Sequence, residues 1–221
     1  MRIGKHGGCV GILSVPCSAP TRAFAPVPRK GVSMSHRRIV IMTEIALTLA
    51  LAYVLGWLKL WQMPQGGDVS LAMLPLFVLA LRRGLPVGLS AGVLYGVLDL
   101  MHPPLYIVHW VQFFLDYPLA FMAVGLAGIF APVLARAAAY GDWKRALWSA
   151  IIPGIALGAV GRFVLHLISG AVFFAEYAEG QPVWAYSAGY NSFVFVSALL
   201  CVIGAALVIP ALQRVVPPEG E

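Results

Sequence analysis

Six apolar segments, most of them long enough to cross a lipid bilayer, fill the sequence after residue 34. Of the 221 residues, 60% are hydrophobic and only 11% are charged, and the mean hydropathy is +0.85. A soluble domain carries roughly twice that charged fraction, so the composition indicates an integral membrane protein. The sequence therefore predicts an all-α fold, a bundle of six transmembrane helices. The six segments are residues 38–61, 69–82, 85–101, 108–135, 146–174 and 184–212.

The two ends of the chain differ from this membrane domain. Residues 1–33 are rich in Gly, Pro, Ser and Arg and show no apolar period. We interpret them as a disordered extension or as the product of a start codon assigned too far upstream, because Met34 directly precedes basic residues and the first apolar segment. The membrane domain then comprises residues 34–214, and residues 215–221 form a short cytoplasmic tail.

The basic residues of the loops indicate how the helices are oriented. Loops 62–68, 102–107 and 175–183 contain no Lys or Arg, whereas the alternating loops and the flanks of the domain contain many. Because basic loops remain in the cytoplasm, both termini are expected to be cytoplasmic. Lys59, near the outer end of the first segment, is the exception. The residues on the expected cytoplasmic side are Arg37, Arg38, Arg82, Arg83, Arg136, Lys144, Arg145 and Arg214.

This orientation places three polar residues at a similar depth. Asp116 is about nine residues into the fourth segment, His166 about eight residues from the outer end of the fifth, and Asn191 about seven residues into the sixth. At the rise of an α-helix, all three lie roughly 10–14 Å below the outer face. Three polar groups on separate helices at one depth predict a pocket that opens to the outside.

A carboxylate in hydrocarbon costs several kcal/mol unless it is paired, so Asp116 has two interpretations. It pairs with a neighbouring helix for packing, or it is the counter-charge of a cationic solute. Taken singly, His166 is more typical of a core histidine than of a ligand contact, and Asn191 is typical of an interhelical hydrogen bond. Together, a carboxylate, an imidazole, an amide and nearby aromatic rings favour a small aromatic cation held partly by cation–π contact. The aromatic residues, which also suit an ordinary interfacial belt, are Trp61, Tyr106, Trp110, Trp184 and Tyr190.

The sequence contains no motif that would make the chain an enzyme. A Walker A motif is absent, so the chain does not itself hydrolyse ATP by the P-loop mechanism, and His102 and His109 lack the company of other zinc ligands. The three cysteines follow no metal or disulfide spacing. No inverted repeat relates the two halves, which argues against a secondary transporter. We expect a binding protein without a metal or cofactor of its own.

Several motifs, in order and spacing, resemble the thiamine-specific substrate-binding subunit (S-component) of the energy-coupling-factor (ECF) vitamin transporters. The resemblance covers residues 43–212. It implies a six-helix protein of the prokaryotic plasma membrane that binds extracellular thiamine with high affinity for ATP-driven uptake. The matching stretches are Thr43–Leu47, Val69–Pro75, Leu79–Gly84, Gln112–Phe121, Gly161–Gly170 and the pair Tyr186 and Asn191.

The resemblance also implies roles for individual residues. Asp116 matches an acidic residue that faces the thiazolium ring, and Tyr186 and Asn191 match the pair that binds the aminopyrimidine. Phe174 stands where a family member has tryptophan. A lid tryptophan of the first outer loop is either replaced here by Trp61 or has no counterpart in this chain. The other pocket residues implied in this way are Tyr106, Tyr117, His166 and Gly170.

Because S-components contain no motor, the resemblance implies a transmembrane coupling subunit and two ATPase subunits as partners. Small residues on the first helix dock the coupling subunit in this family, and Ala46 and Ala50 match them, although internal packing explains such a pair equally well. One alternative is an S-component for another heterocyclic vitamin or precursor. A second, from a different class, is a proton-coupled carrier or membrane-embedded hydrolase that uses Asp116 and His166.

Overall fold

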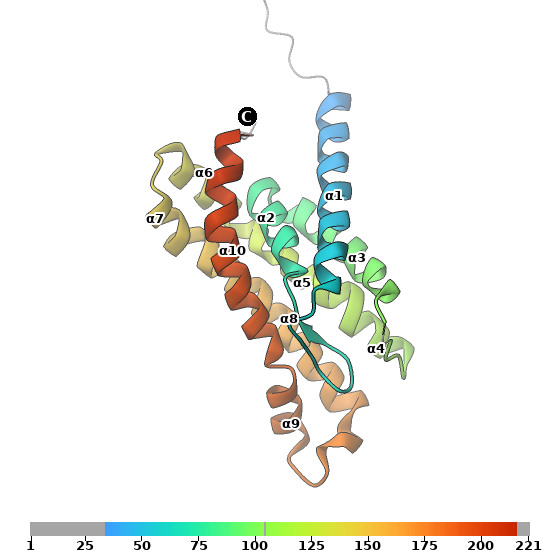
Figure 1. The fold of residues 1–221 in the computed structure, drawn as a ribbon. Helices are drawn as coiled ribbons and strands as arrows, with labels where there is room; N and C mark the ends of the chain where they lie inside the picture. The colour runs from blue at the N-terminus through green and yellow to red at the C-terminus, as the bar shows by residue number, and fades with distance from the viewer. Residues whose placement is uncertain (1–33, 104, 216–221) are drawn as a thin grey trace, which may run out of the picture. The chain divides into compact units, whose positions relative to one another are not determined.

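The computed structural model describes residues 34–103 and 105–215, and most of these residues are helical (Figure 1). The interpretations of residues 1–33 and of the tail after Val215 fall outside the described residues. Two short strands, β1 (Trp61–Gln62) and β2 (Asp68–Val69), pair antiparallel. The helical elements are α1 (Met34–Trp57), α2 (Met73–Arg83), α3 (Leu85–Leu98), η1 (Asp99–Met101), α4 (Trp110–Phe114), η2 (Leu115–Leu119), α5 (Ala120–Val124), η3 (Gly125–Phe130), α6 (Ala131–Ala139), α7 (Trp143–Ala146), η4 (Leu147–Ile151), α8 (Ile152–Phe173), η5 (Ala175–Ala178), α9 (Val183–Tyr190) and α10 (Phe193–Val215).

Four helical runs in the described residues are long and apolar enough to cross a membrane. The shorter apolar run Leu85–Met101 and the helix α2 bring the helical segments to the six expected from the sequence. The expectation of an all-α membrane protein is thereby confirmed. The four long runs are His36–Trp57, Trp110–Ala139, Trp143–Phe173 and Val183–Val215.

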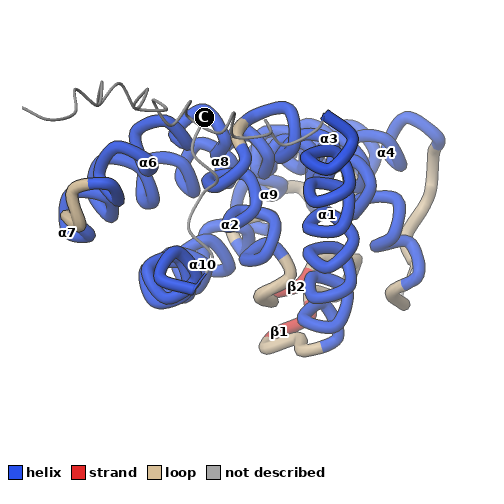
Figure 2. Tube along the Cα trace, turned by 90° about the horizontal axis from the view of Figure 1, so that it is seen from above, coloured by secondary structure: helices blue, strands red, loops and turns tan. Residues whose placement is uncertain are grey.

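The short helix α2 is largely buried inside the bundle. It has 11 residues, eight of which are buried, so it has almost no face left for lipid. Seen from above, it lies between α1 and α10 (Figure 2). Its short length and its burial are those of a helix packed inside the bundle.

Two expected helices end differently from the sequence-based boundaries. The first was expected to reach residue 61, but α1 ends at Trp57 and residues 60–69, called the hairpin below, turn back on themselves. Gly66 and Gly67 form the tip of the hairpin with φ of 92° and 80°, a backbone conformation that favours glycine. The sixth was expected to be continuous, but Asn191 and the following residue separate α9 from α10.

Two π-helical turns interrupt otherwise α-helical spans, and each is associated with a proline. The turn η2 contains Pro118, and η4 ends two residues before Pro153. A proline ring has no N–H to donate and displaces the preceding carbonyl, so the local hydrogen-bond register widens. Asp116 lies on the first of these turns and therefore departs from the regular helical position assumed from the sequence.

Helix α3 lies unusually close to the fourth membrane segment because of its glycines. A Cβ atom at Gly92 or Gly96 would collide with the backbone of Phe121 or Tyr117. Side chains at these positions would push the two helices apart, at a cost of about 1–3 kcal/mol for each. This close packing brings η1, at the end of α3, next to the turn that carries Asp116.

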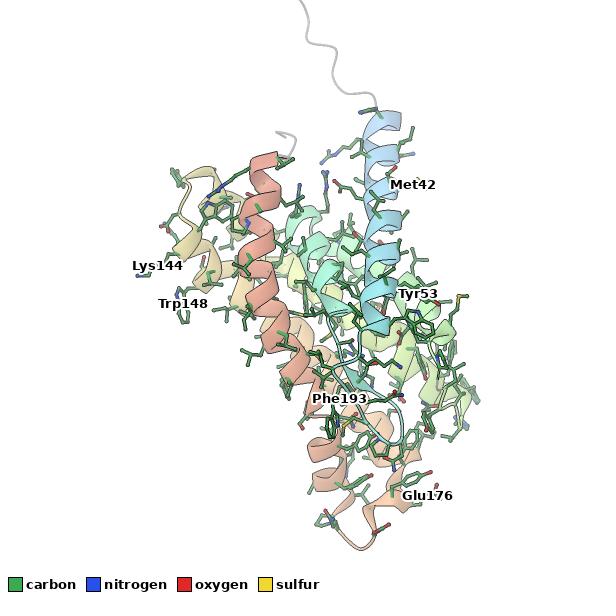
Figure 3. The ribbon with its side chains drawn as sticks, in the orientation of Figure 1. Met42, Tyr53, Lys144, Trp148, Glu176 and Phe193 are labelled. Atoms are coloured by element: carbon green, nitrogen blue, oxygen red, sulfur yellow. The ribbon has the colours of Figure 1, made fainter. Side chains whose placement is uncertain are left out.

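The two ends of the bundle differ in charge. The first turn of α1 and the last turn of α10 lie at one end, and the hairpin and α9 lie toward the other (Figure 1). Lys144 lies toward the first end, whereas the exposed Glu176 lies at the second (Figure 3). Near the first end, Arg83 of α2 forms an ion pair with Glu44 of α1. This distribution matches the separation of basic from uncharged loops in the sequence.

Candidate ligand-binding pocket

A pocket opens among the hairpin, η1, η2, α8, α9 and the start of α10. Its free space, including the mouth, is about 950 Å³. Most of the lining side chains are polar or aromatic, which is typical of a site that binds a small polar ligand. Lining residues beyond the predicted set include Lys59, Gln62, Gln65, Asp68, Asp99, His102, Gln112, Arg162, Tyr177, Ser187, Tyr190 and Phe193.

Of the nine ligand-binding residues expected from the sequence, eight line this pocket. Trp61 does not: it lies in β1, opposite Val69, and its side chain is 67% exposed. The hairpin tip lies instead against the rings of Tyr106 and Phe193, which a Cβ atom at Gly66 or Gly67 would strike. The eight lining residues are Tyr106, Asp116, Tyr117, His166, Gly170, Phe174, Tyr186 and Asn191.

Asp116 accepts hydrogen bonds from three side chains. Gln112 Nε2 donates to Oδ2 over 2.6 Å, Ser169 Oγ donates to the same oxygen over 2.8 Å, and His166 Nδ1 lies 3.0 Å from Oδ1. Such contacts offset the cost of holding a carboxylate in a membrane domain. Sequence reasoning missed Gln112 and Ser169, although the first lies one helical turn before Asp116 and the second three residues after His166.

Arg162 determines the tautomer of His166. The Arg162 Nε–H donates to His166 Nε2 over 3.1 Å, so the proton of a neutral imidazole is on Nδ1 and points to Asp116. The guanidinium also lies 4.1 Å from the centre of the Phe121 ring. No carboxylate among the described residues lies within the 4.0 Å ion-pair distance of the Arg162 guanidinium.

Asn191 connects the break between α9 and α10 to helix α8. Its Nδ2 donates to Ser187 O over 2.9 Å and to His166 O over 3.3 Å, while Ser187 Oγ donates to Leu167 O over 2.9 Å. Gly170 makes this approach feasible, because a Cβ atom there would collide with Ser187 Oγ. Ser187 therefore occupies the space that a side chain at position 170 would need.

Tyr190 fastens the hairpin to α9. Its hydroxyl donates to Gly66 O and accepts from Gln65 N, both over 2.8 Å. One side chain thus satisfies two backbone groups at the hairpin tip, which has little regular structure of its own. The hairpin forms one wall of the pocket, so Tyr190 holds that wall in place.

Two further histidines, His102 and His109, have structural partners. His102 Nδ1 lies 3.0 Å from Asp99 Oδ1, and its Nε2 lies 3.0 Å from Tyr53 O, which connects η1 to α1. His109 Nδ1 accepts from Val111 N over 3.1 Å and so caps the helix α4. Within the described residues, no group of three or more His, Cys, Asp or Glu side chains is arranged to hold a metal ion.

The alanines expected to dock a partner lie outside the pocket. Ala46 and Ala50 are both exposed on α1, on the same face as Met42 and Leu47. Only 11% of the apolar window in this helix is buried. Much of α1 is therefore available to lipid or to another protein.

An all-helical bundle with apolar spans and a polar pocket near one end defines a multi-pass membrane protein with a site for a small polar ligand. The chain belongs to the thiamine transporter protein family (Thia_YuaJ), whose model matches residues 42–216. Membership of this family makes the chain a transport protein rather than an enzyme.

Individual relatives support this assignment. The chain is 38% identical over 176 residues to the thiamine transporter ThiT of Bacillus subtilis, which covers 76% of this chain and 91% of the relative. It is 31% identical over 192 residues to ThiT of Lacticaseibacillus paracasei, covering 84% and 95% of the two chains. The structure is similar to that of ThiT from Listeria monocytogenes, with a TM-score of 0.70, 29% identity and coverage of 82% and 97%.

Proposed function

We propose that this protein is a thiamine-binding S-component of an ECF-type transporter. The observation that carries the proposal is the hydrogen-bonded carboxylate of Asp116 in the pocket wall of a family member. Thiamine joins a permanently cationic thiazolium ring to an aminopyrimidine. A fixed negative charge attracts the thiazolium ring, and hydrogen-bond acceptors with a defined direction bind the aminopyrimidine.

The pocket residues divide accordingly. Asp116 stabilises the cation, and Tyr106, Tyr117 and Phe174 supply aromatic surface for both rings. Asn191 Oδ1 accepts no hydrogen bond from the residues that the structure describes, so it is open to the amino group of the pyrimidine. Tyr186, one wall of the same pocket, completes that subsite.

The proposal also covers orientation and partners. The pocket end faces the outside, and the basic end, with both chain termini, faces the cytoplasm of a prokaryotic cell. The protein has no Walker A motif, so ATP is used by two partner ATPases through a transmembrane coupling subunit. The exposed alanines Ala46 and Ala50 on α1 permit close approach of that subunit.

Isothermal titration of the purified protein in detergent tests the ligand assignment. We expect saturable binding of thiamine at submicromolar concentration. Asp116→Asn should weaken it by about 100-fold or more, because loss of a partly buried charge costs several kcal/mol. Glu176→Gln, an exposed acid outside the pocket, should leave binding unchanged. No binding at millimolar thiamine by folded wild-type protein would contradict the proposal.

Uptake measurements test the transport mechanism. Cells that express the protein together with an ECF coupling subunit and its ATPases should accumulate labelled thiamine. Uptake should stop when the ATPases are inactivated and should persist in the presence of a protonophore. Uptake without the ATPases, abolished by a protonophore, would instead identify a proton-coupled carrier that uses Asp116 and His166.

A further inference from the structure

The hairpin brings a third carboxylate to the pocket. Asp68, in β2, lines the same cavity as Asp116 and Asp99. Its neighbour Val69 is buried in the core, so β2 is held in place by packing rather than by the aspartate. The carboxylate therefore has no evident task in folding the hairpin.

Asp68 differs from the other two carboxylates in its contacts. Asp116 receives hydrogen bonds from three side chains, and Asp99 contacts His102 Nδ1 at 3.0 Å and Tyr95 Oη at 3.3 Å. The Asp68 carboxylate, by contrast, has neither a hydrogen bond nor an ion pair with any other residue that the structure describes. It is the open acceptor among the pocket acids, and a carboxylate offers about four acceptor positions.

The charged side chains that line the pocket allow a cation to bind near Asp68. Neither Asp68 nor Asp99 forms an ion pair with Arg162 or Lys59, which line the same pocket. Arg162 already donates to His166, and Lys59 donates to Pro103 O over 3.0 Å. Three carboxylates thus face two basic side chains, so one negative charge is uncompensated when the histidines are neutral.

We propose that Asp68 is a second ligand-facing carboxylate, which binds the cationic ring of the ligand from the hairpin. The inference rests on the proposed function and extends it to a residue that sequence reasoning did not single out. A cation between Asp68 and Asp116 contacts both the hairpin and the helical wall. Binding therefore stabilises the position of the hairpin, and the pocket prefers cationic over neutral forms of the same shape.

A comparison of two ligands isolates the charge. The probes are thiamine and 3-deazathiamine, a neutral isostere in which a thiophene replaces the thiazolium ring and the pyrimidine is unchanged. Asp68→Asn should weaken thiamine binding about tenfold and leave binding of the neutral isostere unchanged, because only a charge pair is lost. Asp68→Glu keeps the charge and should retain the preference for thiamine. Glu176→Gln is the matched control for loss of a remote acid.

The outcomes separate this inference from the proposed function. If wild-type protein binds thiamine and Asp68→Asn binds it equally well, the inference is wrong and the proposed function stands. If Asp68→Asn weakens both ligands to the same degree, the residue acts on the structure of the hairpin, and the inference is again wrong. If the wild-type protein binds neither ligand, the proposed function itself fails.

Discussion

At the scale of single residues, the pocket depends on small groups that support Asp116. Ser169 and Gln112 both donate to Oδ2, and His166, oriented by Arg162, donates to Oδ1. Removing one neutral donor leaves the carboxylate charged but less well held. A donor to a charged group contributes about 1.5–3 kcal/mol when it is buried.

Ser169→Ala should therefore weaken thiamine binding by about tenfold, less than Asp116→Asn. The loss arises because the carboxylate gains freedom and loses one of its donors, while its charge remains. Equilibrium dialysis with labelled thiamine measures the effect. Ser90→Ala, a helix-surface serine that bonds only to Val87 O, is the matched control. Equal affinities for the Ser169 variant and wild type would show that this bond has no part in ligand binding.

Gly170→Ala should destabilise the protein, because the new methyl group meets Ser187 Oγ. We expect Tm to fall by roughly 4–8 °C, the effect of an overpacked contact in a chain of this size. Ser187→Ala in the same chain removes the obstructing oxygen and should recover part of the loss. A thermal-shift assay in detergent measures all three variants. A Gly170→Ala protein as stable as wild type would mean that α9 is free to move away from α8.

At the scale of elements, the hairpin is a non-helical part of the pocket wall. Tyr190 holds its tip through two hydrogen bonds. Tyr190→Phe should accelerate thiamine release about tenfold with little change in the association rate, because the helical part of the pocket is intact. A chase of bound labelled thiamine with unlabelled ligand measures release. Tyr140→Phe is the control, because Tyr140 is exposed, lies outside the pocket, and its hydroxyl forms no hydrogen bond with other described residues.

The same elements show what sequence reasoning could and could not predict. Counting residues along regular helices correctly predicted that Asp116, His166 and Asn191 lie close together, because every α-helix has the same rise per residue. Two-residue strands have no period, so residues 60–69 were read partly as helix and partly as loop, and Asp68 was overlooked. Trp61 was assigned to the pocket by analogy, yet its place in β1 directs it outward. The π-helical turn at Asp116 depends on how Pro118 is accommodated, which tertiary packing decides.

At the scale of the whole molecule, the separation of basic residues predicts the orientation in the membrane. In a chain whose native cysteines are replaced by alanine, Glu176→Cys should react with a membrane-impermeant maleimide in intact cells. Lys144→Cys should react only after the membrane is permeabilised. Both positions are exposed, so access to the reagent depends on the membrane alone. Reaction of Lys144→Cys in intact cells would show that the protein is oriented the other way.

The outward position of Trp61 has a practical consequence for spectroscopy. None of the six tryptophans, all of which the structure describes, lines the pocket, so no indole is placed to touch a bound ligand. Trp61 lies on the hairpin, and most of its side chain is exposed. Its emission therefore reports the environment of the hairpin rather than contact with the ligand. With the other five indoles replaced, this residue would serve as an intrinsic optical sensor of hairpin position.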